Sequence, residues 1–187
     1  MPLSKDRILD ALRPYRDIIS FAVCLLAANY LWKFTIQGDE GTNEVLWFGL
    51  NLTPPFQWLS EHIAHIAYRL TRLVTSEVSF IAPYTILFDT GFSYSVVWSC
   101  TALKQSFIWL VIMLFARGDF RRKLWFIPLG WICAYVFNIL RITAIGLLCE
   151  THPERFDFYH TILFKYLFYA VLFALWVWWI ERVGKVK

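Results

Sequence analysis

The sequence predicts an all-α polytopic membrane protein with at least four transmembrane helices, an outer amphipathic helix and a short β-hairpin. Three observations support this fold class: the composition, the length of the apolar windows and the placement of the basic residues. Of the 187 residues, 58% are apolar, 19% are aromatic and 17% are charged, whereas soluble domains average about 25% charged residues. The formal net charge of +4 leaves no dense basic surface for nucleic acid. We expect residues 1–187 to form a single membrane domain.

Four windows are long and apolar enough to cross a bilayer core of about 30 Å, which takes roughly 20 residues of helix. The predicted spans cover residues 17–36, 98–116, 124–148 and 161–180. Each window has at most one internal charge, and these are Lys33, Lys104, Arg141 and Lys165. A charged side chain inside a span costs free energy of membrane insertion, so we expect Arg141 to have a function. The lysines are most simply explained as reaching toward lipid headgroups.

The placement of Lys and Arg predicts the orientation of the chain. Basic residues gather before the first span, in residues 117–123 between the second and third spans, and after the fourth. Acidic residues gather at the intervening ends. By the positive-inside rule, both termini and the 117–123 loop are cytoplasmic.

Residues 37–97 then form an outer or interfacial region. Apolar residues recur at helical spacing from Phe56 to Val74 and charged residues line the other face, which predicts an amphipathic helix along the interface. A membrane hairpin over residues 45–74, broken at its Pro-Pro pair, is the alternative. From Tyr84 to Val97, β-branched and aromatic residues alternate around an Asp-Thr-Gly turn, which predicts a short hairpin.

Three chemically active side chains fall at nearly one depth. Counted along each predicted helix from its cytoplasmic end, Cys100, Arg141 and His160 lie at about 24, 26 and 30 Å. The agreement does not depend on which side is outside, because inverting the molecule moves all three together. A thiol, a guanidinium and an imidazole supply a nucleophile, an oxyanion stabiliser and a base, the minimum for acyl transfer. We expect the Cys100 sulfur within about 4 to 5 Å of a His160 nitrogen.

Neighbouring residues are predicted to support this site. Cys100 falls at the first turn of its helix, after Ser99 as N-cap, where the helix dipole favours a thiolate. Lys104 follows four residues later on the same face and is expected to lower the thiol pKa further. Asn138, one turn before Arg141, is placed to orient either Arg141 or the substrate. Taken singly, the cysteine is more simply a small hydrophobic residue.

In order and context these residues resemble the exosortase/archaeosortase family of prokaryotic membrane-embedded cysteine transpeptidases. Ser99-Cys100-Thr101-Ala102-Leu103 resembles the Cys motif of the family, Asn138-Ile139-Leu140-Arg141-Ile142 its Arg motif, and Phe156-Asp157-Phe158-Tyr159-His160 its His motif. The resemblance covers about residues 84–181, with no recognised signal before Tyr84. The family often has glycine in place of Ala102 and often has more spans, so this chain resembles a compact variant.

The resemblance implies a multi-pass enzyme of the prokaryotic inner or plasma membrane with its active site toward the outer face. Its implied partners, besides the lipid bilayer, are substrate proteins with a C-terminal sorting signal: a short motif, a transmembrane helix and a basic cluster. In this hypothesis Cys100 attacks a peptide bond, Arg141 stabilises the oxyanion and His160 protonates the leaving amine. An acceptor amine gives transpeptidation and water gives hydrolysis, and the sequence leaves both open. No metal or organic cofactor is indicated.

Two other function classes fit the composition. A small transporter or channel subunit would bind an anion between helices through Arg141 and Lys165. A non-catalytic membrane assembly factor would hold partner helices on its aromatic surface. A transporter should tolerate Cys100→Ala and fail with Arg141→Ala, whereas an assembly factor should tolerate both.

Overall fold

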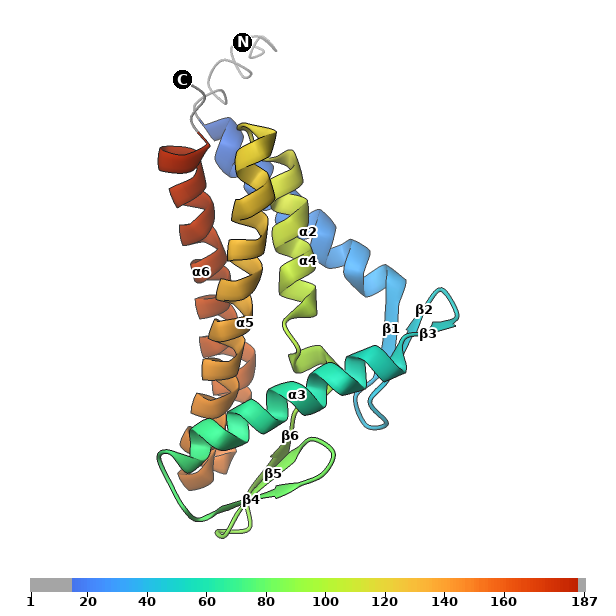
Figure 1. Ribbon diagram of the computed structural model, residues 1–187, viewed down its shortest axis with the longest axis vertical. Coiled ribbons are helices and arrows are strands. Elements are labelled where there is room, and N and C mark those ends of the chain that lie inside the picture. The colour runs from blue at the N-terminus through green and yellow to red at the C-terminus, as the bar shows by residue number, and fades with distance from the viewer. Residues whose placement is uncertain (1–14, 185–187) are drawn as a thin grey trace, which may run out of the picture.

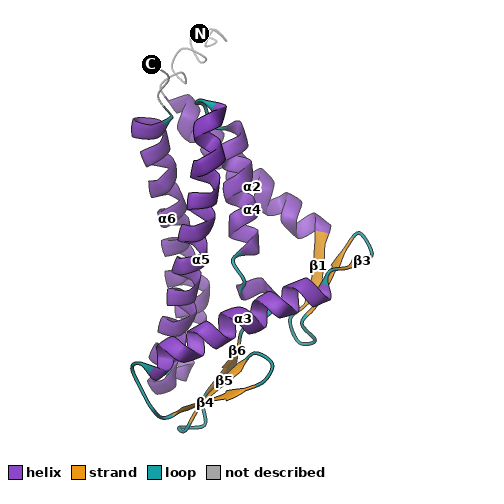
Figure 2. Ribbon diagram, viewed as in Figure 1, coloured by secondary structure: helices purple, strands orange, loops and turns teal. Residues whose placement is uncertain are grey.

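The computed structural model describes residues 15–184 as a helical bundle with two small sheets at one end (Figures 1 and 2). Within these residues, three helical segments are long and apolar enough to cross a membrane. They are α2 (Arg16–Thr35), α5 (Phe120–Thr151) and the segment Pro153–Val183, which contains α6 (Phe164–Trp178). The first, third and fourth predicted spans correspond to these segments. The last two extend beyond the predicted ends.

The second predicted span is not a single helix. Trp98–Cys100 form a 3₁₀ turn, η2, Ala102 has a left-handed φ of 61°, and α4 covers only Leu103–Phe115. Its 13 residues rise about 20 Å, less than the core of a bilayer. The Thr101 hydroxyl donates a hydrogen bond of 2.7 Å to the Trp98 carbonyl, which stabilises the turn in place of a helix. The prediction of a continuous helix over 98–116 is therefore wrong, and a fourth span is not confirmed.

One antiparallel sheet precedes the helix of residues 53–72 in the chain, and a second antiparallel sheet follows it. The first sheet has the order β1 (Ile36–Asp39), β2 (Glu44–Trp47), β3 (Leu50–Asn51). The second has the order β4 (Val78–Ile81), β5 (Thr85–Phe88), β6 (Ser93–Ser95). The predicted hairpin over 84–97 is confirmed as β5 and β6. The first sheet and β4 were not predicted.

Helix α3 (Thr53–Arg72) confirms the predicted amphipathic helix. It crosses one end of the bundle obliquely, and its buried face packs on α5 and the second sheet (Figure 1). Pro54 and Pro55 lie in its first turn, where a missing N–H leaves no helical bond unmade. Because residues 44–51 form strands and turns, the alternative helical hairpin over 45–74 does not form.

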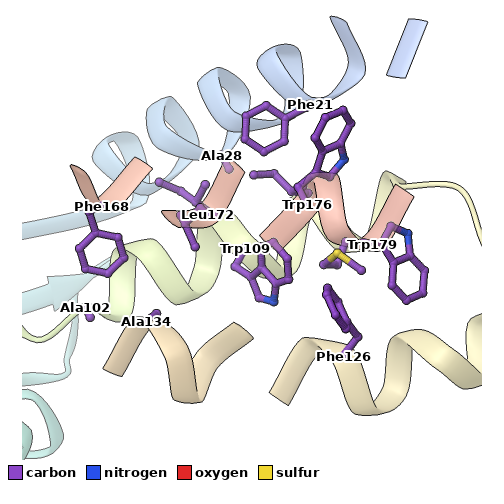
Figure 3. Packing of buried hydrophobic residues seen from close by; sticks show 13 residues of the cluster. Phe21, Ala28, Ala102, Trp109, Phe126, Ala134, Phe168, Leu172, Trp176 and Trp179 are labelled. Carbon is purple, nitrogen blue, oxygen red and sulfur yellow. The ribbon is translucent and has the colours of Figure 1, made fainter. Parts of the chain in front are cut away.

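Aromatic side chains fill the bundle core. Trp109 of α4, Phe126 of α5 and Trp179 at the end of the last helix are fully buried (Figure 3). The Trp109 indole N–H donates to the Ile127 carbonyl at 3.2 Å. Gly130 lies directly against this indole, so a Cβ at that position would collide with it. The close approach of α4 and α5 therefore depends on a glycine.

The end of the bundle opposite α3 is fastened by polar contacts. Asp17 pairs with Arg117 at 3.4 Å, and the Trp179 indole N–H donates to the Arg117 carbonyl at 2.7 Å. Arg122 donates to the Val183 carbonyl at 2.7 Å. The start of α2, the α4–α5 connection and the end of the last helix thus lie together, as the grouping of basic regions predicts (Figure 1). Residues 1–14 and 185–187 lie outside the described part, so the cytoplasmic termini stay a prediction.

Replacing Gly130 by alanine should destabilise the protein, because the gain in helix propensity is smaller than the cost of moving the Trp109 ring. We expect a loss of about 1 to 3 kcal/mol, measured by thermal unfolding in detergent. Gly41→Ala is the matched control, because its added Cβ would meet only an Asp39 carboxylate oxygen at 3.3 Å. Equal or greater stability of Gly130→Ala would contradict the packing described.

Candidate active site

Cys100 and His160 meet at the end of the bundle that α3 crosses. The Cys100 Sγ lies 4.0 Å from the His160 Nε2, although the residues are 60 positions apart in the chain. Both line a cavity of about 270 Å³ between β6, α5 and the start of the last helix. The predicted proximity of thiol and imidazole is therefore confirmed.

Two buried asparagines hold the 3₁₀ turn that carries the cysteine. Asn138 of α5 donates from Nδ2 to the Cys100 carbonyl at 2.7 Å, and its side chain is 1% exposed. Asn43, in the β1–β2 turn, accepts a hydrogen bond of 2.7 Å from the Trp98 amide. Its φ of 55° is one that asparagine tolerates. The sequence predicts Asn138 near the site but gives no sign of Asn43, because nothing local links positions 43 and 98.

The expectations for Ser99 and Lys104 are corrected by the break at Ala102. Cys100 precedes α4 and does not belong to its first turn, and Ser99 makes no capping hydrogen bond. The Ser99 Oγ instead lies 4.0 Å from the Cys100 Sγ. Lys104 lines a different cavity, of about 220 Å³, together with Glu40. The spacing of four residues does not put Lys104 beside the thiol, because no continuous helix joins them.

Burial raises the pKa of the Cys100 thiol above its ordinary value, and the positive charge of Arg141 opposes this rise only in part. The predicted lowering of the thiol pKa by a helix dipole and Lys104 is therefore wrong. A thiol with a raised pKa is protonated near neutral pH and needs a base to become a nucleophile. The His160 imidazole is in place for that role.

Arg141 brings an uncompensated positive charge to the same region. Its side chain is 8% exposed, and one terminal nitrogen donates to the His160 carbonyl at 3.3 Å. Within the described residues its Nε has no hydrogen-bond partner and its guanidinium forms no ion pair. A buried guanidinium without an ion-pair partner stabilises an anion that binds or forms beside it.

The backbone around His160 is wound as a π turn, η4 (Phe158–Leu163). The imidazole stacks on the Phe156 ring with centroids 5.3 Å apart and an interplanar angle of 7°. His160 also lines both cavities, the one beside Cys100 and the one beside Arg141. A π turn inside an apolar helix is typical of functional sites. Here it carries a residue whose imidazole contacts the Cys100 thiol and whose carbonyl contacts the Arg141 guanidinium.

The chain matches a family model described as transmembrane exosortase over residues 42–182. This chain belongs to the transmembrane exosortase family. Membership implies, at the level of the family, a cysteine transpeptidase in a membrane. The match begins well before Tyr84, where the sequence analysis recognised no signal, and includes Asn43. No curated protein and no solved structure matches the chain.

Ala102 lies between the turn that carries the cysteine and the start of α4. Its φ of 61° and ψ of 6° are left-handed, a conformation that glycine adopts without strain. Alanine tolerates it at a cost of about 1 to 2 kcal/mol. Its methyl group is 3% exposed and belongs to the bundle core. The backbone turn that separates the cysteine from α4 is therefore one that glycine would adopt more readily than Ala102.

The pH dependence of Cys100 alkylation in this exosortase should follow the burial of its thiol. We expect the rate with iodoacetamide to rise with a midpoint above the ordinary thiol pKa of about 8.5. Arg141→Gln should move the midpoint higher, because it removes the charge that favours the thiolate. The rate is measured by mass spectrometry of the peptide that contains Cys100.

Lys104→Gln is the matched control in that experiment and should leave the midpoint in place. A midpoint well below 8.5, taken as the ordinary value for a thiol, would contradict the burial effect. A shift with Lys104→Gln as large as that with Arg141→Gln would contradict the assignment of the cationic neighbour.

Proposed function

We propose that this exosortase is a cysteine peptidase or transpeptidase in which Cys100 is the nucleophile, His160 the acid–base residue and Arg141 the oxyanion stabiliser. The observation that carries the proposal is the 4.0 Å contact between the Cys100 sulfur and the His160 imidazole. The Arg141 guanidinium supports it, because one terminal nitrogen donates to the His160 carbonyl while its Nε has no hydrogen-bond partner among the described residues. A nucleophile, an acid–base residue and an oxyanion stabiliser are the groups that acyl transfer requires.

The proposed reaction assigns one step to each of these groups. As the Cys100 sulfur attacks the carbonyl carbon of a peptide bond, its proton passes to the His160 Nε2. The tetrahedral oxyanion accepts hydrogen bonds from Arg141, whose buried charge is worth more there than in water. When the C–N bond breaks, the leaving amine takes the proton from His160 and a thioester remains on Cys100. An acceptor amine or a water then attacks the thioester and regenerates the thiol.

The proposed substrate is a protein with a C-terminal sorting signal, and the enzyme acts on it near the outer face of a prokaryotic cell membrane. The site and the basic 117–123 loop lie at opposite ends of the bundle (Figure 1). A substrate helix lying alongside, with its basic end at the loop side, would therefore present the peptide before its helix at the depth of Cys100. The bilayer and the acceptor are the remaining partners.

Variants of the three residues test the proposal through processing of a co-expressed tagged protein that carries such a signal. Cys100→Ala should abolish processing, and Arg141→Ala should lower its rate by about 10²- to 10³-fold, as expected for a lost oxyanion donor. His160→Ala should lower it as strongly. Processing is measured by the change in mass of the tagged protein, and membrane insertion of each variant is checked in parallel.

Cys133→Ala is the matched control, because Cys133 is a free cysteine of α5 that lines neither of the two cavities. It should process normally. Full processing by Cys100→Ala would remove the enzyme function. Failure of Arg141→Ala alone would instead favour an anion-binding role of the kind expected for a transporter.

A further inference from the structure

Strand β6 is the last strand of the second sheet, and within the described residues it pairs only with β5. Two hydrogen bonds fix which of its residues turn their backbone toward β5. The Phe88 amide donates to the Phe92 carbonyl at 2.8 Å, and the Val96 amide donates to the Tyr84 carbonyl at 3.0 Å. Backbone groups alternate in direction along a strand. Positions 92, 94 and 96 therefore face β5.

The alternate positions, Ser93 and Ser95, direct their N–H and C=O groups away from β5. Both residues are exposed. The Ser95 hydroxyl is 2.7 Å from the Thr85 hydroxyl on the neighbouring strand, so it bonds within the sheet. A free edge of this kind is a template for another extended chain, and proteins usually block it with lysine, proline or a bulge. This edge carries none of them.

The free edge runs along the proposed active site. Residues 92–96 line the same cavity as Cys100 and His160. The chain then passes from β6 directly into the 3₁₀ turn of the cysteine. Any strand that pairs with β6 is therefore held within the cavity where the thiol lies.

Packing against α5 fixes β6 in position. The Tyr94 ring lies so close to Gly146 that a Cβ there would collide with it. The same helix carries Asn138 and Arg141, so one rigid element positions the edge strand, the cysteine turn and the guanidinium. The other lining residues are apolar, among them Ile142 and Ile145 of α5.

We propose that the substrate segment around the scissile bond binds as an extended strand that pairs with β6 through the backbone of Ser93 and Ser95. This inference rests on the proposed function and specifies how the peptide is presented to Cys100. Backbone pairing gives affinity that is independent of sequence, while alternate side chains of the peptide enter the apolar part of the cavity. Because an extended strand exposes each peptide bond, the arrangement delivers a carbonyl to the thiol without a helix having to unwind there.

An N-methyl scan of a peptide reagent tests the pairing. The probe is acetyl-tetraalanine chloromethyl ketone, which alkylates a thiol by forming a bond from sulfur to its methylene carbon and expelling chloride, with loss of the thiol proton. Four analogues each carry one N-methylated amide. The rate of Cys100 alkylation in detergent-solubilised full-length protein is measured by peptide mass spectrometry. We expect losses of tenfold or more at alternate positions and less than threefold at the others, because only alternate amides face β6.

Variants of Ser95 test the protein side of the same contact. Ser95→Pro removes an N–H that points away from β5, so the ladder between β5 and β6 is kept. It should slow the peptide reagent about fivefold and leave the rate with iodoacetamide unchanged. Ser95→Ala keeps the N–H and should react within twofold of the wild type.

The outcomes separate this inference from the proposed function. If the alkylation rate falls without alternation along the scan, strand pairing is overturned. The same holds if iodoacetamide labels Cys100 and no peptide reagent does. In both cases the assignment of Cys100 as the nucleophile is unaffected. A Cys100 that reacts with none of the reagents would overturn both. The scan on the wild-type protein decides even where Ser95→Pro fails to fold.

Discussion

One buried amide on α5 fixes the position of Cys100, the proposed nucleophile. Asn138 donates to the Cys100 carbonyl, and removing such a donor would leave a buried carbonyl unpaired at a cost of about 1 to 3 kcal/mol. Arg141 stands one turn further along the same helix. The distance between the thiol and the guanidinium is thus set by the geometry of one rigid helix, and the short α4 has only to begin after the turn of the cysteine ends.

The site holds a positive charge on Arg141, whereas the negative charge that would balance it forms only during the proposed reaction. The Cys100 thiol is neutral at rest because burial raises its pKa. Arg141 has no anionic partner within the described residues. In the proposed reaction a tetrahedral oxyanion would supply the missing negative charge, and the guanidinium would then stabilise the transition state more than the resting enzyme. Such differential stabilisation raises the rate of the chemical step and not merely the affinity.

The sequence predicts those features that depend on regular periodicity. The rise of an α-helix is constant, so counting residues was enough to bring Cys100, Arg141 and His160 to one depth, and helical spacing was enough to find α3. Hydropathy does not report φ, so the left-handed Ala102 was missed and the inference about Lys104, which needed a continuous helix, failed with it. Asn43 was missed because its contact spans 55 positions of the chain.

Mass spectrometry of Cys100 during turnover would show whether its sulfur carries the acyl group of the substrate. With a protein that carries a C-terminal sorting signal, we expect a thioester between the Cys100 sulfur and the N-terminal part of the substrate. Hydroxylamine should discharge this adduct, and its mass should name the bond that was broken. Accumulation of cleaved product with no adduct on Cys100, and continued cleavage by Cys100→Ser, would show that Cys100 is not the nucleophile.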